Sequence, residues 1–281
     1  MAKRLDPSRG RRPAGAVSAG RSTNSLEKML SLLDVFTPAA PAWSTDDLIR
    51  YSRSSRSTCY RYIKVLQQAG FVTPVANGSY ILGPRILELD RHIRMSDPVY
   101  AAGGRPMQQL ANSTGHSALL CMLYSDTVMC VREELKADAP EGLFSRGQKR
   151  SLFTGAASKV ILAHLPAHQL RSLFAKHRKT IAAAGLGADW QSFRKALRQI
   201  RQDGYCITTG EFVAGITGIA APLFNREAKV LGSLGVATPA SAADRSKFPA
   251  LTQAVVKAAK VVTERIGSGK HGVDLPARAV G

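Results

Sequence analysis

The pattern of hydrophobic positions becomes regular at residue 24 and opens with two short helices. Apolar side chains recur at intervals of three or four between residues 26 and 36, which is the spacing of one helix face. Asn24 or Ser25 can cap this helix, and Pro38 ends it. A second short helix is predicted after Ser44, because a capping hydroxyl is followed there by two aspartates and an apolar run.

A third helix is predicted from the polar turn at 52–55 to about Ala69, where Gly70 supplies a stop signal. Its apolar positions are separated by three, one and three residues, as on one face of a helix. These positions are Cys59, Tyr62, Ile63 and Leu66. The opposite face is basic and rich in hydroxyls, and it carries no acidic residue. It can therefore donate hydrogen bonds to a partner.

A β-hairpin is predicted directly after this helix. Residues 71–75 and 79–82 are β-prone, and the Asn77-Gly78 pair between them is typical of a hairpin turn. Three helices followed by a two-stranded wing make a winged helix-turn-helix, which we expect over residues 23–83. In this motif the second helix of the helix-turn-helix pair, here the third helix, enters the major groove of DNA.

The exposed face of the third helix is therefore the candidate DNA-binding surface. Arginine can contact guanine through two hydrogen bonds, and hydroxyl side chains can contact bases or phosphates. The candidate DNA-binding residues are Ser55, Arg56, Ser57, Thr58, Tyr60, Arg61 and Lys64. The alternative is that the basic members of this set form only a solvated helix face.

A further helix over residues 84–97 is expected to link this domain to a second one. The Gly83-Pro84 pair opens an apolar helical pattern, and Asp97-Pro98 and a Gly-Gly pair follow it, so the domain boundary is expected near residues 94–98. The second domain is expected over residues 98–267. Its predicted elements are a short helix at 105–112, a hairpin at 116–134, helices near 154–165 and 190–205, β-prone runs over 206–239 and a helix at 246–267. A sheet with helices around it is an α+β arrangement.

The charge balance indicates a polyanionic partner. The chain has 39 lysines and arginines against 20 aspartates and glutamates, which gives a net charge of +19. Such a field attracts nucleic acid or an anionic membrane, although a basic protein without such a partner would have the same balance. No apolar run reaches the length of a membrane span and no secretory signal is present, so a cytoplasmic protein with no membrane partner is expected.

Two segments lack the pattern of a core. Residues 1–22 are rich in Arg, Gly, Ser and Pro, and we expect a disordered basic arm that either contacts phosphates or remains a solvated tail. Residues 268–281 are expected to form a second disordered tail.

Candidate catalytic and metal-binding groups do not form a known constellation. His164 and His168 have the spacing of a helical metal site, but Pro166 between them is expected to break the helix. Cys121 and His116 could form a nucleophile pair, yet residues five apart on a strand point to opposite faces. The four cysteines are scattered and are expected to be reduced thiols. We expect no enzyme, no metal and no cofactor.

Several motifs, taken in order, carry a resemblance to a known family. They are SRSTCYRYIKVLQQAGFV with YILGPRILEL downstream, then SLFTGAASKVILAHL, then DGYCITTGEFVAGITGIAAPLF, then GSLGVATP. From about Asn24 to Gly267 the chain resembles the IclR-type bacterial transcriptional regulators. The resemblance implies an N-terminal winged helix, a linker helix and a GAF-like C-terminal domain that binds a small molecule. It also implies a homodimer or tetramer on a palindromic operator.

The family's effector pocket is lined by a small-residue helix start and by strands that follow a glutamate motif. The residues that the resemblance implies here are Leu143, Leu152, Gly155, Ala156, Ala157, Ser158, Thr208, Glu211, Gly218, Ile219, Gly235 and Ala237. Some members that bind small oxo-acids carry serines at the positions of Gly235 and Ala237. They also carry Asp near the Thr208 position and Cys at the Gly218 position.

These departures predict a roomier and less polar pocket than in those members. The ligand expected is a larger, partly apolar organic acid, such as an aromatic one, with the helix start at 154–158 helping to hold its carboxylate. Close helix–sheet packing is the alternative explanation of the small residues. The sequence thus predicts an effector-responsive DNA-binding regulator, with an architectural DNA-binding protein without an effector as the alternative.

Overall fold

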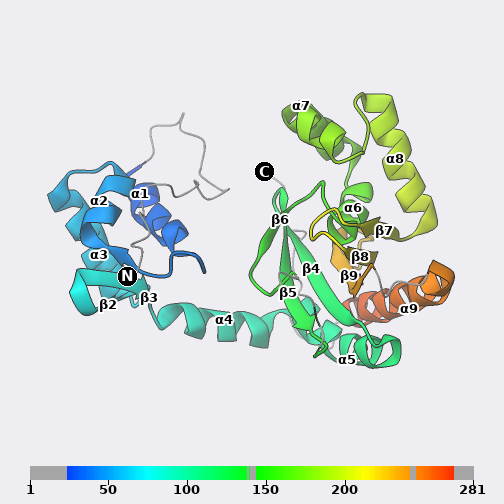
Figure 1. The fold of residues 1–281 in the computed structure, drawn as a ribbon, viewed down its shortest axis with the longest axis horizontal. Coiled ribbons are helices and arrows are strands. Elements are labelled where there is room, and N and C mark those ends of the chain that lie inside the picture. The colour runs from blue at the N-terminus through cyan, green and yellow to red at the C-terminus, as the bar shows by residue number, and fades with distance from the viewer. Residues whose placement is uncertain (1–23, 138, 140–143, 241–244, 269–281) are drawn as a thin grey trace, which may run out of the picture. The chain divides into compact units, whose positions relative to one another are not determined.

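The computed structural model describes residues 24–137, 139, 144–240 and 245–268 (Figure 1). Residues 1–22, the predicted tail beyond residue 268 and Leu143 therefore lie outside the described part of the chain. The chain divides into two compact units between Ile93 and Arg94. No helix of the described residues is long and apolar enough to cross a membrane.

The first unit opens with helices whose starts are fixed by side-chain caps. Its helices are α1 (Ser25–Ser31), a 3₁₀ turn (Leu32–Val35), α2 (Thr45–Ser52) and α3 (Arg56–Gln68). Asn24 caps α1, Ser44 accepts the Asp47 N–H at the start of α2, and Ser55 accepts the Thr58 N–H at the start of α3. The predicted caps at Asn24 and Ser44 are therefore confirmed, whereas the cap at Ser55 was not predicted and the first predicted helix becomes a 3₁₀ turn in its second half.

The predicted apolar stripe of α3 is the core of the first unit. Its members Cys59, Tyr62, Ile63 and Leu66 are all buried, together with Leu32, Val35, Leu48 and Val72 from the other elements. The Tyr62 hydroxyl also lies 2.8 Å from the Ser25 hydroxyl, which satisfies the polar end of a buried aromatic side chain. Burial of this stripe leaves the opposite face of α3 in solvent.

The predicted wing is present and has a third strand. β2 (Val72–Val75) pairs antiparallel with β3 (Ser79–Leu82), and Asn77 and Gly78 both have positive φ in the turn between them. The hairpin is thus confirmed. β1 (Trp43–Ser44), which the sequence pattern did not indicate, pairs with the other edge of β3 and gives the order β1-β3-β2.

Two helices follow the wing: α4 (Arg85–Ser96) and α5 (Pro98–Thr114). The sequence placed a short helix at 105–112 and treated the Gly-Gly pair before it as part of a boundary. Instead α5 starts at Pro98, capped by Asp97, and runs through both glycines. The reason is packing, because a Cβ on Gly103 would lie 2.7 Å from Leu120 Cδ2. The small residue lets α5 approach the sheet closely.

The second unit is built on one antiparallel sheet of six strands in the order β6-β5-β4-β9-β8-β7 (Figure 1). The strands are β4 (Ser117–Tyr124), β5 (Thr127–Glu134), β6 (Lys149–Ser151), β7 (Cys206–Thr209), β8 (Ile216–Phe224) and β9 (Val230–Pro239). The predicted α+β class is confirmed. β4 and β9 form the middle of the sheet and are almost wholly buried.

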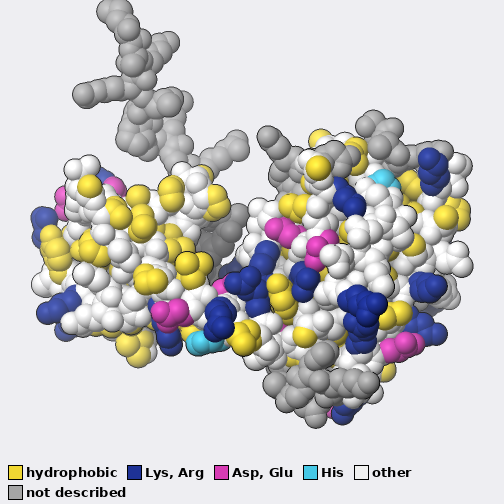
Figure 2. Space-filling model, turned by 90° about the horizontal axis from the view of Figure 1, so that it is seen from below, with side chains coloured by type: hydrophobic (Ala, Val, Ile, Leu, Met, Phe, Trp, Pro, Cys, Tyr) yellow, Lys and Arg dark blue, Asp and Glu magenta, His cyan; other side chains and the backbone are white. Residues whose placement is uncertain are grey.

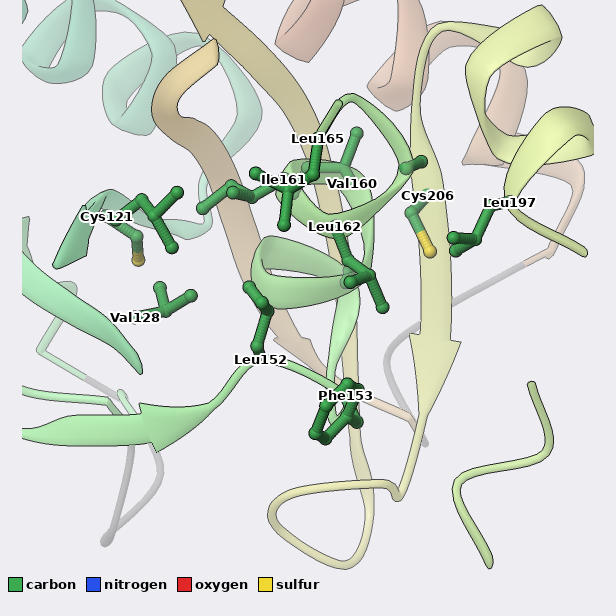
Figure 3. Close-up of a cluster of buried hydrophobic side chains, with 14 of the residues drawn as sticks. Cys121, Val128, Leu152, Phe153, Val160, Ile161, Leu162, Leu165, Leu197 and Cys206 are labelled. Atoms are coloured by element: carbon green, nitrogen blue, oxygen red, sulfur yellow. The ribbon is translucent and has the colours of Figure 1, made fainter. Parts of the chain in front are cut away.

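Helices cover both faces of this sheet. α5 and α9 (Phe248–Gly267) lie on one face, and α6 (Ala156–Ala163) lies on the other, with α8 (Trp190–Asp203) packed on α6. α7 (Ala167–Ala183) lies between α6 and α8 along the chain. Leu120 and Met122 of β4 pack with α5 and α9, whereas Leu119 and Cys121 belong to the cluster that includes α6 and α8. Figure 3 shows Cys121 in this second cluster, with Ile161 of α6 and Leu197 of α8. α7 was not predicted, because only three of its residues are buried and its apolar period is weak.

Candidate functional site

The predicted DNA-contacting side chains lie together on the outer face of α3. Six of the seven are exposed, and Thr58 is half-buried. Ser55 serves as the N-cap and its hydroxyl lies 2.8 Å from that of Thr58, so these two hydroxyls are partly used within the helix start. Arg61 and Lys64 form no ion pair within the described residues and project beside Tyr60.

A hollow of about 290 Å³ separates this face of α3 from the wing. It is lined by Tyr60, Arg61, Lys64 and, from β3, Tyr80. Tyr80 was not among the predicted contacts, because its side chain reaches the α3 face only through the fold of the hairpin. A phenol can donate a hydrogen bond to a phosphate or a base edge, so Tyr80 joins the candidate DNA surface.

Arg56 is held by an acidic neighbour. Its Nη2 lies 3.1 Å from Asp46 Oδ1 of α2, and both side chains are mostly exposed. Its guanidinium also lies 5.9 Å from the centre of the Tyr60 ring. An exposed ion pair of this kind is weak, so Arg56 can exchange Asp46 for a phosphate.

Figure 2 shows one face of the molecule, on which Lys and Arg side chains cover more area than Asp and Glu.

In the second unit, nine of the predicted effector residues line one small cavity between the start of α6 and the sheet. They are Gly155, Ala156, Ala157, Thr208, Glu211, Gly218, Ile219, Gly235 and Ala237. Leu152 and Ser158 do not line this cavity; both are buried in the core. The structure thus brings together most of the predicted set, from segments that are far apart in the sequence.

The cavity is small, with a volume of about 50 Å³. That is room for about one or two water molecules rather than for an aromatic acid. The expectation of a roomy pocket is therefore wrong for this structure. The physical reason is that side chains occupy the space: Glu211 reaches across to the start of α6, and Arg150 and Phe212 line the same wall.

The N-terminus of α6 is already satisfied from within the chain. The Gly155 N–H donates to Glu211 Oε2 at 2.9 Å, and the Ala156 N–H donates to the Thr208 hydroxyl at 2.9 Å. Lys159 Nζ, from the next turn of α6, lies 2.6 Å from Glu211 Oε1. These two helix N–H groups therefore already have acceptors, unlike the open helix start that the sequence suggested.

Arg150 is the cation of this cavity that sequence reasoning missed. Its guanidinium carbon lies 3.5 Å from the centre of the Phe144 ring and 3.2 Å from that of Phe212. It forms no ion pair within the described residues, and its Nε is buried without a hydrogen-bond partner. Burial lowers the pKa of Arg150 to about 10. A half-buried cation without a counter-ion favours an anion beside it.

The other candidate groups do not come together as a catalytic site. α6 ends at Ala163 and α7 begins at Ala167, so Pro166 separates His164 from His168 as predicted. Cys121 faces Cys130 across the β4–β5 pair, and this contact and burial raise the pKa of Cys121. A thiol held in its protonated form is a poor nucleophile.

Two family models match this chain. The helix-turn-helix model of IclR regulators matches residues 25–76, and the model of the bacterial transcriptional regulator IclR C-terminal domain matches residues 95–264. The chain belongs to the IclR family. This IclR-family protein is therefore a DNA-binding transcriptional regulator, and its relatives are regulators and repressors rather than enzymes.

Relatives match along nearly their whole length. The transcriptional regulator XynR of Escherichia coli is 24% identical over 86% of this chain and 97% of its own, and the transcriptional repressor IclR of the same organism is 25% identical over 95% and 99%. A solved regulator from Silicibacter sp. TM1040 has a TM-score of 0.72 at 26% identity and covers 87% and 96% of the two chains. An IclR homologue from Microbacterium hydrocarbonoxydans, solved with 4-hydroxybenzoate, has a TM-score of 0.72 at 19% identity. The match covers 86% of this chain and 99% of the homologue.

Proposed function

We propose that this IclR-family regulator binds an organic acid, including aromatic acids, at the start of α6 and that this ligand changes its affinity for its operator. The observation that carries the proposal is Arg150, a cation in the cavity wall with no counter-ion among the described residues. A ligand carboxylate supplies the missing charge and can accept two parallel hydrogen bonds from the guanidinium. The complex of the Microbacterium relative with 4-hydroxybenzoate supports the same ligand class.

Ligand entry requires the cavity to open. Phe212 is 47% exposed and stacks on Arg150 from the outside, whereas Phe144 on the other side of the guanidinium is fully buried. An aromatic acid can take the place of Phe212 against the guanidinium plane, because Arg stacks on any flat ring. Phe212 would then move into solvent while Phe144 remains in place.

The DNA-binding half of the proposal is that two copies of the chain bind a palindromic operator through paired α3 helices. The family belongs to a class of regulators in which half-site symmetry follows protein symmetry. Ligand can shift DNA affinity only if it binds the DNA-competent and DNA-incompetent states with different affinity. A homodimer whose α3 spacing differs between the two states meets this condition.

Two measurements test the two halves separately. Fluorescence anisotropy measures binding to DNA from beside the protein's own gene, with excess random DNA as competitor. The wild type should bind this DNA, and Arg61→Ala should lower the affinity by about tenfold or more. Arg171→Ala, which removes the same charge from exposed α7, is the matched control and should leave specific binding nearly unchanged. Equal losses in both variants would mean that only general charge attraction is being measured.

Titration with 4-hydroxybenzoate tests the effector site. Binding to the wild type and its loss in Arg150→Met, with operator binding by that variant unchanged, is the expected result. Arg146→Met removes a neighbouring cation that does not line the cavity and should leave ligand binding intact. Operator binding that no aromatic or aliphatic acid alters would favour the architectural alternative and refute the effector site.

A further inference from the structure

A second cavity, of about 510 Å³, lies at the other end of α6, where the α6–α7 junction, α8 and the turn before β9 meet. It shares no lining residue with the cavity at the start of α6, so it is independent of the proposed effector site. Its volume falls within the range of small-molecule sites, which is about 300–1,000 Å³. Leu123, Leu165, Leu197 and Phe224 form its apolar floor.

A row of cations borders this floor. Arg194, Arg198 and Arg201 are separated by four and three residues and so lie along one side of α8, and Lys229 stands opposite on the turn before β9. None of the described residues that line the cavity is Asp or Glu. Seven residues of helix extend over about 10 Å, so the cations can meet several negative groups of one ligand.

No buried carboxylate among the described residues neutralises these cations. Arg201 Nε donates to the Ala163 carbonyl at 2.9 Å at the end of α6, which fixes the guanidinium but leaves its charge. Arg198 has no hydrogen bond or ion pair within the described residues. Lys229 pairs with Glu227 at 2.6 Å, but both side chains are more than half exposed, so solvent weakens this pair.

We propose that this cavity binds an organic phosphate: an apolar or planar body on the floor and phosphate groups on the arginines of α8. A single carboxylate would occupy one guanidinium, whereas the row of charges matches two or more phosphate groups. Phe224 is half-buried and lines the cavity, and its ring lies T-shaped to that of His164 with 5.2 Å between the ring centres, so it offers an aromatic surface for a planar body. A DNA backbone would meet the arginines but would leave the apolar floor empty.

The test is calorimetric titration of the full chain with adenosine triphosphate, coenzyme A and inorganic pyrophosphate. We expect at least one of the two organic phosphates to bind at least about tenfold more tightly than pyrophosphate, because only the organic ligands cover the floor. The double variant Arg194→Ser/Arg198→Ser should weaken this binding by about tenfold or more. Both side chains are exposed, so the variant is expected to fold.

The matched control is Arg171→Ser/Lys195→Ser. It removes two exposed cations from α7 and α8 that do not line the cavity, so it changes the net charge equally. This variant should bind the organic phosphate within about twofold of the wild type. Arg150→Met should also bind it normally, which separates this cavity from the effector site.

Three results would overturn the proposal. The first is the absence of heat with all three ligands at millimolar concentration. The second is equal weakening by the two double variants, which would mean diffuse charge attraction. The third combines two observations: none of the phosphate ligands binds, and Arg194→Ser/Arg198→Ser loses affinity for random DNA while the control variant keeps it. That result would assign the arginines to DNA binding.

Discussion

The ion pair between Lys159 and Glu211 gives a quantitative test of how the start of α6 is held. The Lys159 side chain is only 8% exposed, and its ammonium lies 2.6 Å from Glu211 and 2.9 Å from the Ala184 carbonyl. Lys159→Met keeps the apolar stem and removes the charge. Glu211 then keeps the Gly155 N–H as its partner, and the Ala184 carbonyl loses its donor.

The expected cost follows from these contacts. Removal of one partner of a buried ion pair costs about 3–5 kcal/mol, and because Glu211 is 30% exposed we reduce this to about 2 kcal/mol. The unsatisfied carbonyl adds about 1 kcal/mol. We therefore expect Lys159→Met to lower the free energy of unfolding of the second unit by about 3 kcal/mol. Glu211→Gln should cost at least as much, because it leaves the more deeply buried ammonium without its carboxylate.

Urea unfolding followed by tryptophan fluorescence measures this change. The chain has two tryptophans, and Trp43→Phe leaves Trp190, which packs on Phe174 and Phe193 in the second unit, as the reporter. In the double variant Lys159→Met/Glu211→Gln, the loss in free energy of unfolding should be about 2 kcal/mol smaller than the sum of the losses in the two single variants.

The exposed pair at Lys229 is the control for this experiment. Lys229→Met should change the free energy of unfolding by less than about 0.5 kcal/mol. A loss of the same small size in Lys159→Met, or strictly additive losses in the double variant, would refute the assignment of a coupled buried pair.

Three further predictions concern single side chains. Gly235→Ser should destabilise the second unit by about 2–3 kcal/mol, because its Cβ would lie 2.5 Å from the Ile219 carbonyl, whereas Ala237→Ser should cost less than about 1 kcal/mol. Asp46→Asn should raise DNA affinity about threefold by releasing Arg56. Burial lowers the pKa of His164 below its usual 6.5, so His164 binds a proton more readily in the unfolded chain than in the folded one. The free energy of unfolding should therefore fall as the pH drops through 6.5, and His164→Gln should reduce that fall.

Each of these has a direct check. Thermal melts compare the two serine variants, and equal melting temperatures would contradict the close approach at Gly235. Anisotropy with the Asp46→Asn/Arg56→Ala double variant should show no gain in affinity over Arg56→Ala alone. Urea titrations at pH 7.5 and 5.5 test the histidine, with exposed His168→Gln as control; an unchanged pH dependence in His164→Gln would contradict its burial as the cause.

The DNA-binding unit could be predicted almost completely from the sequence because its signals are local. The caps at Asn24 and Ser44, the stripe of α3 and the Asn77-Gly78 turn each act within a few residues. β1 could not be predicted, since two residues acquire strand character only when β3 lies beside them.

The second unit shows where such signals end. The small residues of the cavity followed from the family resemblance, but Arg150 did not, because its position between two rings depends on Phe212, which is distant in sequence, as well as on the nearby Phe144. The cavity at the other end of α6 likewise required the fold, because Leu123 and Phe224 come beside the arginines of α8 only through the sheet. Residues that pair locally can be inferred from spacing, while those that meet across the core cannot.

The alternation along β4 limits how the length of this strand can vary among related proteins. Leu119 lines the cavity at the start of α6 and Leu123 lines the cavity at its other end, while Leu120 and Met122 between them pack towards α5 and α9. A one-residue insertion or deletion within β4 would exchange these faces and bring each side chain to the wrong layer. Homologues should therefore differ in β4 by substitution alone, and insertions should gather in the turns at its ends.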